Sequence, residues 1–201
     1  SYSNPKTYTV ETSKRLCNPS KTGYHFDGWF LDSGFTAPVS SLQKGTTGNL
    51  DLYAKWTLET YTITYELNGG TVTGDNPSSY TYLSGPYTFA DAQKRGYEFN
   101  GWRVNSSDGY LIDGFSAGSY HENLILYADF EAIRYSVSYE LDGGTNHANN
   151  PDSYTIENNA YTLRAPSRDG YAFRGWFTDE ACTDSVTKIA TDGCEDLTFY
   201  A

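Results

Sequence analysis

Three heptapeptides, "GYHFDGW" (residues 23–29), "GYEFNGW" (96–102) and "GYAFRGW" (170–176), hold the side chains of this sequence best suited to ligand chemistry. Exposed aromatic rings stack against sugar rings, so three matched indoles could form a glycan-binding ladder. The same rings form the core of a small domain when they are buried, since each removes a large apolar area from water. The nine aromatic residues concerned are Tyr24, Phe26, Trp29, Tyr97, Phe99, Trp102, Tyr171, Phe173 and Trp176.

The glycine before each tryptophan decides between these two interpretations. In a regular strand Phe99 and Trp102 would point to opposite faces, because successive side chains alternate. A glycine within a strand often marks a β-bulge, and a bulge at Gly101 would turn Trp102 to the face of Phe99. The positions between the aromatic residues vary among the heptapeptides, which is typical of a solvent face. We therefore predict that the nine aromatic residues form the structural core.

The spacing of the heptapeptides shows that the sequence is repetitive. Trp29, Trp102 and Trp176 lie 73 and 74 residues apart, and an Asn-Pro pair recurs at similar intervals. Self-similarity at a fixed period indicates tandem modules, here three. We define repeat 1 as residues 1–57, repeat 2 as 58–132 and repeat 3 as 133–201. Repeat 2 is complete, repeat 1 lacks its first strand and repeat 3 is nearly complete.

Strand-type alternation opens repeats 2 and 3. In "YTITYELNGGT" (61–71) and "YSVSYELDGGT" (135–145) apolar and polar residues alternate, and a turn-forming Asn-Gly or Asp-Gly pair follows. A second strand is expected in "KTYTV", "SSYTY" and "DSYTI", a third in the heptapeptide and a fourth at residues 50–56 and 124–130. Between the second and third strands, "NPSKTG", "ADAQKRG" and "APSRDG" place a basic residue shortly before glycine, which predicts a short helix of one or two turns. The expected fold class is α+β, with one short helix over a small sheet in each repeat.

The linkers lead to an expectation about the stiffness of the array, and the first repeat leads to one about its own order. Four residues separate Trp56 from Tyr61 and Phe130 from Tyr135. Such short connections limit swivelling, so an elongated, semi-rigid array is expected. Repeat 1 lacks the opening strand, which would leave a sheet edge able to pair with another chain. We predict that repeat 1 is the least ordered repeat or that it borrows a strand from a neighbouring molecule.

The three cysteines are Cys17, Cys182 and Cys194. When repeat 3 is laid on repeat 1, Cys182 falls at Phe35 and Cys194 at Thr46, so both flank the connection between the third and fourth strands. We predict a Cys182–Cys194 disulfide, because an oxidising environment is expected for this protein. Cys17 would then be the odd cysteine, either free and buried or linking two molecules. The sequence has no C-x-x-C spacing, so a zinc site is not indicated.

Other chemistry has little support in the sequence. The histidines occupy different positions in the three repeats, and no Ser-His-Asp arrangement, phosphate-binding loop or H-E-x-x-H motif is present. No acidic cluster has the spacing of a calcium loop. Glycosidase chemistry needs two carboxylates flanking a cleft, and repeats this small offer no obvious cleft. We expect no catalytic residue, no cofactor and no metal.

The charge distribution indicates which classes of partner the protein is suited to bind. The net charge is −11, and the charge is −7 in repeat 2 and −6 in repeat 3. Because binding of nucleic acid depends on neutralising phosphates, two acidic repeats argue against it, and they also disfavour anionic lipid. No apolar run of the length of a membrane span occurs, so no membrane insertion is expected. No signal peptide is visible, and the start at Ser1 looks like that of a cut-out fragment, so the sequence does not argue for a cytoplasmic location.

The "YELNGGT" start, the GYxFxGW centre and the "LYAKW" end of these repeats together resemble the Listeria–Bacteroides repeat family, which includes the B-repeat modules of internalin B. The resemblance covers essentially the whole chain. It implies a β-grasp (ubiquitin-like) fold, an extracellular and usually bacterial cell-surface protein, and no enzymatic activity. This chain departs from the pattern in its truncations, in Phe130 standing for tryptophan and in its cysteines.

These observations favour a non-catalytic tandem repeat segment of a secreted or cell-surface bacterial protein. It would act as an extended spacer and a protein-interaction or adhesion module, with a host or bacterial surface protein as partner. The alternative is a carbohydrate-binding accessory module that uses exposed aromatic residues, with a glycan as partner.

Overall fold

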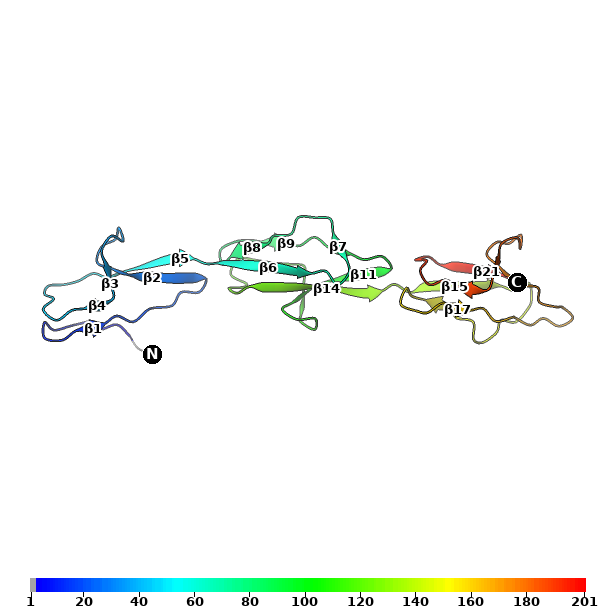
Figure 1. Cartoon of the computed structure of the whole chain (residues 1–201), viewed down its shortest axis with the longest axis horizontal. Helices are drawn as coiled ribbons and strands as arrows, with labels where there is room; N and C mark the ends of the chain where they lie inside the picture. The colour runs from blue at the N-terminus through cyan, green and yellow to red at the C-terminus, as the bar shows by residue number, and fades with distance from the viewer. Residues whose placement is uncertain (1–2) are drawn as a thin grey trace. The chain divides into compact units, whose positions relative to one another are not determined.

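The computed structural model describes residues 3–201, and each repeat consists of short β-strands joined by turns (Figure 1). The chain divides into two compact units. One comprises Ser1–Thr64, Asn76–Phe89 and Asp113–Leu126, and the other comprises Tyr65–Asp75, Ala90–Ile112 and Tyr127–Ala201. Repeat 2 therefore contributes residues to both units, because the divisions after Thr64 and after Leu126 fall within it.

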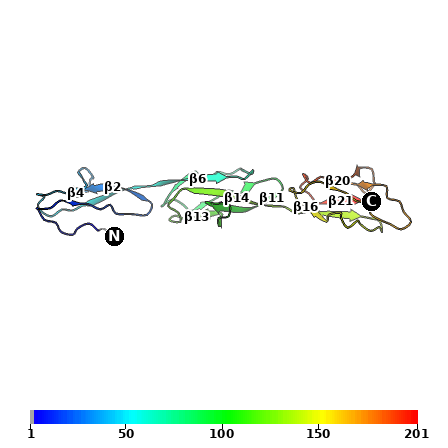
Figure 2. The same cartoon turned by 60° about the horizontal axis from the view of Figure 1, so that its bottom comes forward.

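Repeat 2 contains a five-stranded sheet with the order β12-β11-β14-β6-β8. Its strands β14 and β6 lie side by side in both views (Figures 1 and 2). Two small two-stranded sheets, β10-β7 and β13-β9, complete the repeat. Its strands are β6 (Thr60–Glu66), β7 (Thr71–Val72), β8 (Ser79–Thr81), β9 (Tyr87–Thr88), β10 (Ala92–Gln93), β11 (Tyr97–Val104), β12 (Leu111–Ile112), β13 (Gly114–Phe115) and β14 (Leu124–Ala132).

Repeat 3 also has a five-stranded sheet, in the order β16-β15-β21-β18-β19, and β17 pairs with β20. The opening strand β15 runs parallel to the last strand β21, with Val137 opposite Leu197 and Tyr139 opposite Phe199. Its strands are β15 (Tyr135–Glu140), β16 (Ser153–Tyr154), β17 (Tyr161–Thr162), β18 (Trp176–Phe177), β19 (Ser185–Val186), β20 (Lys188–Ile189) and β21 (Leu197–Tyr200).

Repeat 1 has a smaller sheet of three strands in the order β3-β2-β5, and β1 pairs with β4. Among residues 3–201, β5 pairs with β2 alone and so forms one edge of this sheet. The register between β2 and β5 shifts between Phe26 and Gly28, which is the β-bulge expected at the glycine of the heptapeptide. Its strands are β1 (Lys14–Arg15), β2 (Tyr24–Phe30), β3 (Pro38–Val39), β4 (Ser41–Leu42) and β5 (Tyr53–Leu58).

The predicted short helix is wrong: residues 3–201 contain no helix, so the α+β assignment, with a β-grasp helix in each repeat, is corrected to a β-rich repeat fold. In repeat 2 the segment "ADAQKRG" forms β10, and Ala92 pairs with Val72. In repeat 3 Ser167 forms a bridge with Thr145. Segments this short cannot offset the cost of starting a helix, and pairing with a neighbouring segment satisfies their backbone groups instead. Since there is no helix in the described chain, none could cross a membrane.

The apolar core of each complete repeat lies against the opening and last strands. In repeat 3 Val137 of β15 belongs to a buried cluster with Tyr154, Ile189, Phe199 and others. In repeat 2 the corresponding Ile63 is 4% exposed, and Leu124 and Leu126 of the last strand are fully buried. The alternation read from the sequence therefore places apolar side chains on one face of these strands.

Candidate functional site

All three heptapeptide tryptophans make the same hydrogen bond. Each donates its indole Nε1–H to the backbone carbonyl of the residue 12 positions earlier. Trp29 donates to Cys17 at 3.0 Å, Trp102 to Ala90 at 3.2 Å and Trp176 to Arg164 at 3.0 Å. An indole N–H that is removed from water needs such a partner, and this bond fixes the orientation of each ring.

The depth of the tryptophans differs between the repeats. Trp102 is 0% and Trp176 is 2% exposed, whereas Trp29 is half-buried. The opening strand accounts for this difference, because it supplies a tyrosine that packs edge-on against the indole. The ring centroids of Tyr65 and Trp102 are 5.1 Å apart, and those of Tyr139 and Trp176 are 5.3 Å apart. In the described part of repeat 1, residues 3–57, no strand takes this place beside Trp29.

The heptapeptide phenylalanines also differ. Phe26 packs against Trp56 at 5.2 Å and Phe99 against Phe130 at 5.6 Å, measured between ring centroids. These partners follow the Tyr-Ala pair of the last strand. In repeat 3 Phe173 is 39% exposed and Tyr171 67% exposed. The two side chains line a surface hollow of about 590 Å³ in repeat 3.

A basic side chain covers each heptapeptide tyrosine. Lys21 Nζ lies 3.7 Å from the ring centroid of Tyr24, and Lys94 Nζ lies 4.0 Å from that of Tyr97. In repeat 3 the Arg168 guanidinium carbon lies 3.9 Å from the ring centroid of Tyr171. Such cation–π contacts occupy one face of the ring. The sequence signal for these contacts is a basic residue three positions before each tyrosine, a pattern that from sequence alone also predicts the end of a helix.

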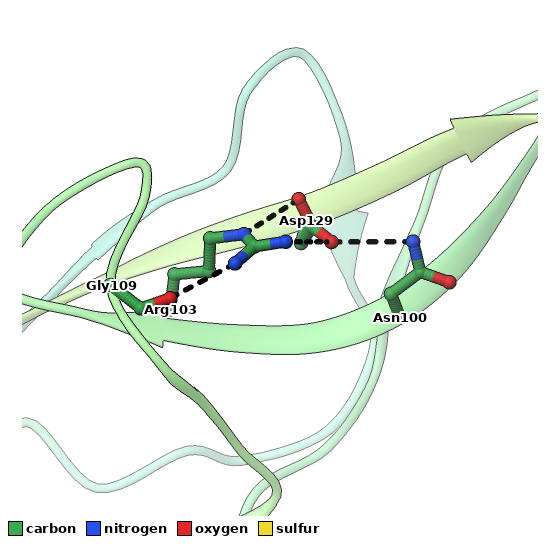
Figure 3. A network of polar contacts seen from close by, with 4 residues as sticks. All are labelled: Asn100, Arg103, Gly109 and Asp129. Carbon is green, nitrogen blue, oxygen red and sulfur yellow. Dashed lines mark hydrogen bonds and ion pairs between the residues drawn. The ribbon is translucent and has the colours of Figure 1, made fainter.

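A polar network joins β11 to β14 in repeat 2 (Figure 3). Arg103 donates to both carboxylate oxygens of Asp129, at 2.9 and 3.0 Å, and to the Gly109 carbonyl at 2.9 Å. Asn100 donates to the same carboxylate at 3.2 Å. The hydrogen bond from Arg103 lowers the pKa of Asp129 and raises that of Arg103. A carboxylate held ionised in this way is a poor general base near neutral pH, so the network connects two strands rather than supplying acid–base chemistry.

The cysteines lie in different surroundings. All three are free thiols in this structure, so it contains no Cys182–Cys194 bond. The exposed Cys182 Sγ lies 3.7 Å from the Glu180 carbonyl oxygen, and the half-buried Cys194 forms a hydrogen bond with the Tyr135 side chain. Cys17 is half-buried, and its backbone N–H donates to the Asn4 side-chain oxygen at 2.6 Å. The Cys182–Cys194 pairing stays a prediction.

Two aspartates organise matching turns in repeats 1 and 3. Asp32 accepts hydrogen bonds from the backbone N–H groups of Thr36 and Ala37, and Asp179 accepts them from Thr183 and Asp184. These bonds lower the pKa of both carboxyl groups.

Within residues 3–201 no group of three or more His, Cys, Asp and Glu side chains is placed to hold a metal ion.

Comparison with known proteins gives three consecutive matches to one family. The model of the Listeria-Bacteroides repeat domain matches residues 1–55, 61–129 and 135–201. No solved structure matches the chain.

Three relatives are longer than this chain. A putative membrane protein of Evansella cellulosilytica is 32% identical over 188 residues, which are 91% of this chain and 27% of that protein. A putative Gly-rich membrane protein of the same bacterium is 28% identical over 186 residues, 91% of this chain and 21% of the relative. Internalin H of Listeria monocytogenes is 31% identical over 121 residues, 60% of this chain and 21% of internalin H. The chain thus spans about a quarter of the length of the relatives it matches. Because the family model covers nearly every residue in three tandem matches, the chain belongs to the Listeria-Bacteroides repeat domain family.

Proposed function

We propose that this chain is a non-catalytic repeat segment of a bacterial secreted or cell-surface protein, where it acts as a spacer and a protein-interaction or adhesion segment. The relatives support a surface location, since two are named as putative membrane proteins and the third as an internalin. The partner proposed is a host or bacterial surface protein.

One observation carries the spacer role: consecutive repeats meet through the same contact. In one unit Tyr82 of repeat 2 packs on Gly23 of repeat 1 so closely that a methyl group on Gly23 would overlap it. In the other unit Ile156 of repeat 3 packs on Gly96 of repeat 2, where a methyl group would lie 3.0 Å from Ile156 Cδ1. Gly23 and Gly96 open their heptapeptides, and Tyr82 and Ile156 each follow a buried tyrosine by two positions. Because matching residues form both joints, each repeat can be held against the next in the same way, as a spacer made of tandem repeats requires.

Polar contacts reinforce the joint between repeats 2 and 3. The Tyr97 hydroxyl donates to Glu157 Oε1 at 3.0 Å, and Arg95 donates to the Asp192 carbonyl at 2.7 Å. The backbone N–H of Ile133 in the linker donates to the Gly96 carbonyl at 3.0 Å. At the preceding joint the N–H of Glu59 makes the same bond to Gly23, at 2.9 Å. The two linkers are thus attached in the same way.

Intramolecular distance measurements test the spacer role. Donor and acceptor dyes would be attached at Lys44→Cys and Lys188→Cys, two exposed positions, after replacing the native cysteines by serine. A spacer predicts a narrow distance distribution that widens when Tyr82→Gly and Ile156→Gly remove the joint side chains. The control Tyr110→Ser removes a ring that is 61% exposed and should leave the distribution unchanged. A distribution as broad as that of a flexible linker in the unaltered chain would refute the proposal.

A second experiment separates spacing from interaction. Beads carrying the chain, a chain shortened by one repeat and chains with altered exposed residues would be tested for attachment to cells. Attachment that depends on length but not on the altered surface indicates a spacer. Attachment by one isolated repeat indicates a ligand site, and no attachment by any bead contradicts the adhesion part of the proposal.

Glycan binding is the second candidate function, and the hollow of repeat 3 is the feature that favours it. Its exposed rings, Tyr171 and Phe173, offer apolar surface to a sugar. The burial of Trp102 and Trp176 counts against a ladder of three stacking tryptophans. A glycan that binds the chain but not Tyr171→Ala would support this alternative.

A further inference from the structure

We propose that the outer face of the repeat 2 sheet binds a neutral sugar residue in a small polar pocket. The pocket has a volume of about 250 Å³ and is lined, among others, by Glu66, Asn68, Arg103, Ser107, Tyr127 and Asp129. Pockets for drug-sized ligands measure roughly 300–1,000 Å³, so this one suits a single small ring. The site adds a ligand class to a segment proposed above to act through protein contacts, and it does not depend on that role.

The strands of repeat 2 place the charged groups and the ring of this pocket on one face of the sheet. Arg103 of β11 lies between two buried residues, and Tyr127 and Asp129 of β14 flank the buried Ala128. Because successive side chains of a strand point to opposite faces, these three side chains point away from the core. β6, which ends at Glu66, is the other neighbour of β14 in the sheet. Three adjacent strands therefore hold these groups in defined positions, as a binding site requires.

The guanidinium group of Arg103 is ordered before any ligand binds (Figure 3). It donates to both carboxylate oxygens of Asp129 and to the Gly109 carbonyl, which uses three of its five N–H groups. Within residues 3–201 the other two N–H groups donate to no residue. A ligand that accepts hydrogen bonds from them does not have to immobilise the side chain, which lowers the cost of binding.

Four other side chains of the pocket can bind a ligand without breaking a contact. Within the described residues the side chains of Glu66, Asn68, Ser107 and Tyr127 form no hydrogen bond with another residue. A glutamate carboxylate accepts hydrogen bonds, whereas an amide or a hydroxyl group both donates and accepts them. Tyr127 adds a half-buried aromatic ring, which offers apolar surface beside these polar groups.

The charges of the pocket disfavour an ion as ligand. Arg103 is paired with Asp129, and Glu66 adds a second carboxylate, so one positive and two negative groups give a formal charge of −1. An anion would face both carboxylates, and a cation would leave the remaining N–H groups of Arg103 without an acceptor. The hydroxyl groups of a neutral sugar can accept from Arg103 and donate to Glu66. The apolar face of the same sugar can pack on the Tyr127 ring.

The polar pair of this pocket is not needed for the fold of the repeat. The residue after the heptapeptide tryptophan is Arg103 in repeat 2, but it is Phe30 in repeat 1 and Phe177 in repeat 3. Asp129 corresponds to Lys55 of repeat 1, whose Nζ lies 5.8 Å from the ring centroid of Phe30. The corresponding strands thus pair with a phenylalanine and a lysine in place of the arginine and the aspartate. Binding of a ligand accounts for a polar pair that the fold does not require.

An NMR titration with simple sugars tests the proposal. The methyl glycosides of glucose, galactose, mannose and N-acetylglucosamine would each be added to the isotope-labelled chain. We expect at least one of them to cause saturable shifts of the amides of residues 66–68 and 127–129 and of the Arg103 Nε–H. Because the ligand is uncharged, its affinity should change little with added salt. No saturable shift at these positions with any of the sugars overturns the proposal.

Matched variants distinguish the pocket from non-specific contact. Glu66→Gln replaces a charged acceptor by a neutral one and should weaken binding about three- to tenfold. Glu98→Gln, the same change at an exposed position of β11 outside the pocket, should not alter binding. The double variant Arg103→Phe with Asp129→Lys introduces the pair found in repeat 1, and it should abolish binding while the amide spectrum of the core stays that of a folded repeat. Unchanged binding by Glu66→Gln and by the double variant contradicts the site.

Two further results would also overturn the proposal. Shifts confined to the surroundings of Tyr171 and Phe173 would assign the sugar to the hollow of repeat 3. Binding of methylammonium chloride in the pocket, without binding of any sugar, would identify a cation as the ligand. The dye distances that test the spacer role do not involve the sugar, so the two proposals are refuted by different results.

Discussion

Tyr65 lies edge-on against Trp102, with ring centroids 5.1 Å apart and an interplanar angle of 74°. Tyr139 and Trp176 repeat this contact at 5.3 Å. In both repeats the opening strand supplies the tyrosine and the heptapeptide supplies the tryptophan, so the pair joins the two most recognisable sequence motifs of the repeat.

The first prediction concerns the indoles. Trp102→Ala should destabilise repeat 2 by about 3–5 kcal/mol, the usual cost of removing a fully buried tryptophan. Trp29→Ala should destabilise repeat 1 less, because Trp29 is half-buried. Hydrogen exchange resolved by repeat measures both changes, which matters because a chain of several modules need not unfold in one step. Equal losses in the two repeats would contradict this account of burial.

The second prediction concerns the Arg103–Asp129 pair. The hydrogen bond from Arg103 lowers the pKa of Asp129 in the folded chain, so the pair stabilises repeat 2 above the ordinary aspartate pKa of about 3.9. This contribution is lost as the pH falls through the lower folded value. Asp129→Asn should cost about 1 kcal/mol at neutral pH, since both side chains are partly exposed, and should flatten the acid limb of the stability curve. Urea unfolding between neutral and acid pH measures this, and an unchanged acid limb would contradict it.

The third prediction concerns the turn at Asp179. Its carboxylate accepts the backbone N–H groups of Asp184 and Thr183, and these bonds lower its pKa. Asp179→Asn should therefore speed hydrogen exchange of those two amides at neutral pH. In the unaltered chain the same loss of protection should occur only as the pH falls below the ordinary aspartate range. The neighbouring exposed change Glu180→Gln is the matched control and should leave both amides as they are.

The fourth prediction concerns the thiols. Cys182 is exposed and Cys194 is half-buried beside Tyr135, so a thiol reagent should label Cys182 faster than Cys194 in the reduced, folded chain. Mass spectrometry of the labelled peptides measures the two rates. Peptide mapping after oxidation tests the pairing expected from the sequence: a bond between Cys182 and Cys194 supports it, and a bond to Cys17 or between two molecules refutes it.

The helix was the main error of prediction. The Lys-Arg-Gly run at residues 94–96 has the composition of a helix end, but Lys94 instead places its ammonium group over the Tyr97 ring. Composition near a glycine does not distinguish these outcomes. The Tyr97 ring lies only three positions after Lys94, but β7, the strand that pairs with β10, lies in another part of the sequence.

The sequence alone determined the tandem repetition, the alternation of the opening strands and the bulge at the heptapeptide glycine. These follow from spacing and from the local preferences of the backbone. Only the tertiary structure decided how deeply each matched ring is buried. Trp29 and Trp102 have nearly the same local sequence, yet only Trp102 is covered by a strand that lies 36 residues before it. Burial depends on contacts between distant segments, which the local sequence of a motif does not encode.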